Sequence, residues 1–135
     1  MSEELRAKLT NVGLLVGRVA IGLLMLVGHG YPKLLEFSAK AATFPDPLGI
    51  GSGLSLGLAV FAEFFCAILI IIGAATRLAA IPLVVTMLVA GLIFHSADPW
   101  STQEKAIVYA VPFLMLVFTG PGKLSVDALV DFMGE

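Results

Sequence analysis

Residues 17–37 read GRVAIGLLMLVGHGYPKLLEF, an apolar run with an arginine near one end and a histidine and a lysine near the other. On a helix that turns about 100° per residue, Arg18, His29 and Lys33 share one narrow stripe. Apolar residues surround this stripe, so its polar groups must face protein or an aqueous cavity rather than lipid. The run therefore predicts a membrane-spanning helix whose polar side faces the interior of a bundle.

The composition indicates an integral membrane protein with one domain. Hydrophobic residues make up 59% of the 135 residues and charged residues only 13%, roughly half the charged share of a soluble domain. The length fits one small bundle, so we expect a single domain over residues 1–135. The net charge of −2 offers no basic surface for nucleic acid. The single cysteine, Cys66, excludes an intrachain disulfide.

Four apolar segments are each close to the ~20 residues that cross a bilayer. They cover residues 11–30, 54–73, 77–95 and 102–119. We expect the first to end where Pro32 disfavours the continuation of a helix. Short turns join the last three segments, which predicts an all-α, antiparallel four-helix membrane bundle.

The segments outside the four spans predict two smaller features. The connection from residue 31 to residue 53 predicts a short interfacial helix and then an irregular segment folded over the mouth of the bundle. After the fourth span, Ser125 is placed to cap a short amphipathic helix over about residues 125–132.

The four spans imply that the protein lies in a lipid bilayer. An even number of spans places both chain ends on the same side of it. The positive-inside rule favours a cytoplasmic location for the termini. Its margin is one residue, because four cations lie outside the spans on the terminal side and three on the other: Arg6, Lys8, Arg77 and Lys123, against Lys33, Lys40 and Lys105.

Two charges lie at membrane depth, Arg18 in the first span and Glu63 in the second. Helical rise places them within roughly 5 Å in depth, a gap that an arginine side chain bridges. An isolated charge at this depth costs several kcal/mol, so we expect the two to form a buried pair. The pair is either a structural ion pair or a catalytic element that handles protons or anchors a ligand.

Further polar residues gather at the non-cytoplasmic mouth of the predicted bundle. His29 and Lys33 end the first span and His95 ends the third, where they are expected to bind a substrate or cofactor and to move protons. Tyr109 in the fourth span joins them, because its hydroxyl needs a partner within the bilayer.

Two other interpretations of this mouth stay open. One is an ordinary solvated polar rim. The other, which lacks the usual His-x-x-x-His or Glu-x-x-His spacing, is a divalent metal site made from His29, His95, Asp98 and Glu104.

Several motifs, in order along essentially the whole chain, resemble the DoxX family. They are Arg18, Gly28-His-Gly-Tyr-Pro-Lys33, Glu63, Gly73-Ala-Ala-Thr-Arg77 and Gly120-Pro-Gly-Lys-Leu-Ser-Val-Asp127. The resemblance implies a small four-helix protein in the cytoplasmic (inner) membrane of a prokaryote, of a kind often described as an oxidoreductase. Relatives are associated with thiosulfate-to-quinone electron transfer and with membrane complexes that handle oxidative stress or thiols. The motif positions that carry over are Arg18, His29, Lys33, Glu63, Arg77 and Asp127.

Residues and resemblance together predict a membrane oxidoreductase component that binds a quinone or a similar amphipathic small molecule in the bundle. A quinone suits such a site because its ring needs an apolar slot and its two carbonyls need donors at opposite ends. No side chain here is a redox centre by itself, so electrons would come from the bound molecule or from a partner, either a soluble redox protein or a second copy. The alternatives are a non-catalytic scaffold for soluble redox enzymes and a small transporter that uses the Arg18–Glu63 pair.

Overall fold

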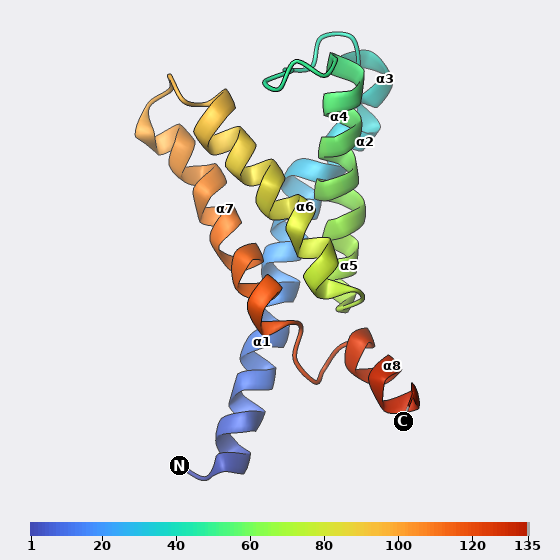
Figure 1. The fold of residues 1–135 in the computed structure, drawn as a ribbon, viewed down its shortest axis with the longest axis vertical. Helices are drawn as coiled ribbons and strands as arrows, with labels where there is room; N and C mark the ends of the chain where they lie inside the picture. The colour runs from blue at the N-terminus through green and yellow to red at the C-terminus, as the bar shows by residue number, and fades with distance from the viewer. Residues whose placement is uncertain (135) are drawn as a thin grey trace.

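The computed structural model describes residues 1–134, which form an all-helical bundle (Figure 1). Four helical rods account for most of the chain. Each of the first three contains a π-helical segment, labelled η, which interrupts the first two rods and ends the third. The rods are α1 (Glu3–Met25), η1 (Leu26–Gly30) and α2 (Tyr31–Leu35); α4 (Ser52–Val60), η2 (Phe61–Cys66) and α5 (Ala67–Ile72); α6 (Thr76–Leu88) and η3 (Val89–Phe94); and α7 (Trp100–Thr119).

The all-α membrane bundle expected from the sequence is confirmed. Three rods are long and apolar enough to cross a bilayer: Glu3–Leu35, Ser52–Ile72 and Thr76–Phe94. The fourth, α7, has 20 residues, or about 30 Å of helical rise, and packs against α6. Its first turns carry the polar residues 101–105, which shorten its apolar stretch.

The first rod does not end at Pro32, and that expectation from the sequence is wrong. The helix continues to Leu35. Just before the proline, the N–H of Tyr31 donates to the carbonyl of Leu26, the five-residue spacing of a π turn. Because proline lacks an N–H and its ring crowds the preceding turn, the wider π turn is the local adjustment that lets the helix pass it.

The core lies where the rods cross. Met25, Leu56, Ile70, Leu83 and Phe113 are completely buried and come from all four rods. Outside the core, many large apolar side chains on every rod are exposed, as expected for surfaces that meet lipid.

The two ends of the bundle differ. Figure 1 shows both chain termini at one end, where α1, α5 and α7 converge. At the other end the α6–α7 hairpin diverges from α4, and the loop after α3 (Phe37–Lys40) reaches into the space between them.

The final helix, α8 (Val126–Gly134), lies beside the terminal end of the bundle. The expected cap is present, because Ser125 Oγ accepts a hydrogen bond from the N–H of Ala128 at 3.2 Å. Leu129, Val130 and Phe132 remain exposed, so α8 carries an apolar face outside the bundle.

Candidate functional site

A cavity of about 410 Å³ lies at the divergent end of the bundle. Its walls come from η2, α4, the end of the first rod, and the α6–α7 hairpin, and the loop of residues 44–50 covers it. Most of the lining is apolar. The polar or titratable lining residues are His29, Lys33, Ser55, Glu63, Thr86, His95, Thr102, Lys105 and Tyr109.

The loop over the cavity is organised by Asp46. Its carboxylate accepts hydrogen bonds from the N–H groups of Ile50 (2.9 Å) and Gly51 (2.7 Å) and from the hydroxyl of Ser55 (2.8 Å). These bonds, with that from Gly51 foremost, hold the pKa of Asp46 below its usual value. They tie the loop to the first turn of α4, so Phe44 and Leu48 lie over the cavity. The predicted segment over the bundle mouth is therefore present.

The three π-helical segments all border this cavity. His29 lies in η1, Glu63 in η2, and Val89 and Phe94 in η3, and all four line it. A π turn changes the direction of the side chains around it and is often found at functional sites. Three of them around one space make it the leading candidate site in the bundle.

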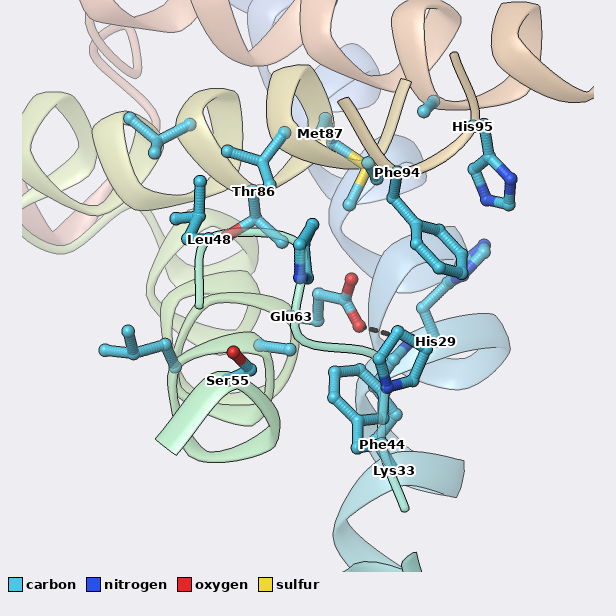
Figure 2. A pocket seen from close by; sticks show the side chains of 18 of the residues that line it. His29, Lys33, Phe44, Leu48, Ser55, Glu63, Thr86, Met87, Phe94 and His95 are labelled. Carbon is cyan, nitrogen blue, oxygen red and sulfur yellow. Dashed lines mark ion pairs between the residues drawn. The ribbon is translucent and has the colours of Figure 1, made fainter. Parts of the chain in front are cut away.

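The central polar feature of the cavity is an ion pair. The Lys33 Nζ lies 2.6 Å from Oε2 of Glu63 (Figure 2), and the two side chains are 26% and 5% exposed. No other donor reaches Oε2 among residues 1–134. Lys33 is thus the charge partner of a carboxylate that is otherwise enclosed.

The structure corrects the expectation that Arg18 pairs with Glu63. Helical side chains lean toward the N-terminus of their own helix, and the first two rods are antiparallel. Arg18 therefore points toward the terminal end, whereas Glu63 points toward the cavity and meets Lys33. Arg18 is not among the lining residues of the cavity.

Arg18 instead binds backbone carbonyls where α5 ends and the C-terminal segment passes. Its Nη1 donates to the carbonyls of Ile70 (3.3 Å) and Ile71 (2.5 Å), which end α5. Its Nε donates to Pro121 at 3.3 Å, and its Nη2 donates to Leu124. The last carbonyls of a helix have no intrahelical partner, so a buried guanidinium satisfies them and joins three parts of the chain.

Asp127 completes this arrangement from α8. Its carboxylate accepts hydrogen bonds from the N–H groups of Ala75 (2.6 Å) and Thr76 (2.9 Å), at the start of α6. Partial burial acts to raise the pKa of Asp127, but these hydrogen bonds and nearby Arg18 outweigh it and hold the pKa below its usual value. Gly73 adopts a left-handed φ of 73°, and a Cβ there would lie 2.6 Å from Cβ of Ser125. Only glycine fits this turn.

The family motifs thus separate into two groups at opposite ends of the bundle. Arg18, Gly73, Asp127 and Arg77, which lies against Gly120, belong to the terminal end. His29, Lys33 and Glu63 line the cavity. From the sequence, His29 and Lys33 were expected at the far mouth, whereas Glu63 was expected at mid-membrane in a pair with Arg18.

The two histidines have different surroundings. The ring of His29 meets the ring of Tyr109 edge to face, with centroids 5.2 Å apart. His95 lies nearer the opening, where its Nδ1 is 2.5 Å from Oδ2 of Asp98. Among the described residues, no group of three or more His, Cys, Asp or Glu side chains is placed to hold a metal, so the alternative site of His29, His95, Asp98 and Glu104 is not formed.

Several lining residues were not identified from the sequence. Thr86, Thr102 and Lys105 contribute polar groups from the hairpin, and Phe44 and Leu48 cover the cavity from the loop. Thr86 and Lys105 are nineteen positions apart on separate helices, so helical periodicity could not link them. The loop residues carried a signal in Asp46, a typical N-terminal capping residue that precedes the second rod.

Comparison with known proteins agrees with the fold and the motifs. Residues 13–96 match the family model described as DoxX. The chain is 29% identical over 128 residues to Inner membrane protein YqjF of Escherichia coli. The alignment covers 92% of this chain and 96% of the relative. It is 30% identical over 126 residues to Inner membrane protein YphA of the same organism, covering 84% of this chain and 87% of the relative.

A third relative, an uncharacterized protein of Haemophilus influenzae, is 29% identical over 92 residues, covering 64% of this chain and 61% of the relative. No solved structure matches the chain significantly. The family model covers more than half of the sequence and includes every cavity segment up to His95. This membrane protein therefore belongs to the DoxX family.

Proposed function

We propose that this chain is a component of a membrane oxidoreductase that binds a quinone or a similar amphipathic small molecule in the cavity. One observation carries the proposal: a largely apolar space of about 410 Å³ with the Lys33–Glu63 ion pair, whose carboxylate is buried, in its wall. Ionisable residues at membrane depth are expensive and mark ligand or proton pathways. A packed structural core would fill this space with side chains.

The lining suits an amphipathic ring with polar substituents. Leu58, Val85 and Phe94 offer apolar surface for the ring. Hydrogen-bond donors come from separate elements, Lys33 on the first rod and Lys105 on α7. Pockets with apolar walls and a few convergent polar groups are the common form of small-molecule sites.

The proposed roles follow from position. Lys33 and Glu63 hold the polar end of the ligand, and His29 with Tyr109 lies beside them. His29 and His95 exchange protons between the cavity and its opening. A quinone, when bound, exchanges two electrons and two protons; a soluble redox protein or a second copy of the chain is the proposed electron partner.

The names of two relatives support a location in the inner membrane of a prokaryote. The proposed orientation places both termini in the cytoplasm, which puts the cavity at the opposite face. Arg18 and Asp127 then hold the C-terminal segment on the cytoplasmic side.

Binding of an alkylated benzoquinone to the protein in nanodiscs tests the proposal. We expect wild type to bind and Ala90→Trp, which fills the cavity, to weaken binding at least about tenfold. Ala20→Trp is the matched control, because Ala20 is exposed on α1 away from the cavity. Absence of binding by wild type, or equal binding by Ala90→Trp, contradicts the proposal and favours the scaffold.

A further inference from the structure

We infer that the cavity recognises a hydroxyl group through Glu63, so that the reduced, hydroxyl-bearing form of the proposed ligand binds more tightly than the oxidised, carbonyl form. This inference rests on the proposed function, because it specifies which member of the ligand class the same site prefers.

The Glu63 carboxylate has free capacity to accept hydrogen bonds. A carboxylate has about four lone-pair positions that can accept hydrogen bonds. Within residues 1–134 its one charged partner is Nζ of Lys33, 2.6 Å from Oε2, which uses only part of this capacity. The residue is only 4% exposed, and the acceptor positions that Lys33 leaves free are costly to bury without donors. A ligand that supplies a donor removes this cost.

The carboxylate is also directed and held in place. Figure 2 shows Glu63 pointing into the space between His29 and the hairpin side chains. Its backbone is fixed by Gly30, because a Cβ on Gly30 would lie only 2.1 Å from the carbonyl oxygen of Glu63. The backbone that carries the acceptor is therefore held at the cavity wall.

The remaining polar groups do not produce the same preference. Lys33, Lys105 and Tyr109 can donate hydrogen bonds, and a carbonyl oxygen accepts such bonds at least as well as a phenolic oxygen, so these donors do not favour the hydroquinone. Among residues 1–134, Glu63 is the one carboxylate that lines the cavity, and it only accepts when ionised. A quinone carbonyl has no proton to offer it, whereas a quinol hydroxyl has one.

The size of the preference follows from the type of bond. A hydrogen bond to an ionised group is stronger than a neutral one, and its net effect corresponds to roughly a ten- to hundredfold change in affinity. We therefore expect a hydroquinone to bind at least about tenfold more tightly than a matched molecule without hydroxyl protons.

The test compares three probes with one alkyl tail: a decyl hydroquinone, the decyl benzoquinone and the hydroquinone dimethyl ether. Affinities are measured without oxygen on the full chain in nanodiscs. The quinone is similar in size to the hydroquinone, and the ether is larger, but neither has a hydroxyl proton. If both bind more weakly than the hydroquinone, the difference comes from the hydroxyl protons and not from size alone. Glu63→Gln should reduce the preference to roughly threefold or less. Glu104→Gln, at an exposed acid outside the cavity, should keep it.

Each outcome decides the inference. The inference is supported if the hydroquinone binds more tightly and Glu63→Gln removes this difference. If Glu63→Gln does not fold, the comparison of the three probes on wild type decides alone. Equal affinities for the three probes overturn the hydroxyl preference and leave the proposed function standing. Failure of all three probes to bind overturns both.

Discussion

The close packing at Gly30 gives the sharpest prediction about how the site is built. A Cβ added at Gly30 would lie 2.1 Å from the carbonyl oxygen and 2.3 Å from the carbonyl carbon of Glu63. Both are backbone atoms, so a side-chain rotation cannot relieve the contact. An ordinary contact needs more than 3 Å, so η1 and η2 must separate by about 1 Å.

Gly30→Ala should therefore lower the free energy of unfolding by roughly 1–2 kcal/mol. Overpacking costs about 1–3 kcal/mol or more, and the gain in helix propensity on replacing glycine returns at most about 1 kcal/mol. The same displacement moves Glu63 relative to Lys33, so quinone binding should weaken as well.

The assay is reversible unfolding of the protein in mixed micelles, with Gly28→Ala as the control. Gly28 lies in the same π-helical segment, but an added Cβ meets nothing within 4 Å. Gly28→Ala should be neutral or stabilising by up to about 1 kcal/mol. If Gly30→Ala is as stable as Gly28→Ala, the packing of the first rod against Glu63 is not as described.

Three further changes test other contacts. Lys33→Met leaves Glu63 without a cation and should destabilise the protein by about 2–3 kcal/mol in the same unfolding assay. The loss is smaller than for a fully buried pair because Lys33 is partly exposed. A loss below about 0.5 kcal/mol would refute this pairing. Asp127→Ala should loosen α8 by about 1–2 kcal/mol, measured as faster proteolysis of the C-terminal segment with the bundle intact. Folding lowers the pKa of Asp127, so its contribution to the stability of α8 on the bundle is complete above the ordinary pKa of about 3.9. This contribution declines as the pH falls through the lowered pKa. If the fluorescence anisotropy of a label on α8 stays constant between pH 6 and pH 2, this role of Asp127 is contradicted. Asp46→Ala should free the loop over the cavity and speed dissociation of a bound quinone, visible in stopped-flow traces as a higher off-rate; an unchanged off-rate would show that the loop does not retain the ligand.

Much of the fold could be predicted because lipid imposes strong rules on a sequence. Long apolar runs must be helices, so the four rods, the tight turn at Gly73 and the helix capped by Ser125 were evident. The position of Pro32 was misleading, because a π turn absorbs the missing hydrogen bond and the helix continues.

The site was predicted only in part, for a physical reason. His29 and Lys33 were correctly assigned to the far mouth, because they follow the first apolar run. The partner of Arg18 could not be found from depth, since depth ignores the direction in which a helical side chain leans. Its actual partners are backbone carbonyls, which every residue carries and no motif marks.

The most direct test of the central claim, that a quinone-like molecule binds in the cavity beside the Lys33–Glu63 pair, is photoaffinity mapping. A quinone with a photoreactive group is irradiated with the protein in nanodiscs, and the labelled peptides are identified by mass spectrometry. The account predicts labels concentrated on residues 44–50, 85–95 and 102–109, which unlabelled quinone competes away and Ala90→Trp suppresses. Labels spread over the exposed outer faces of the rods, unaffected by competitor, would contradict it.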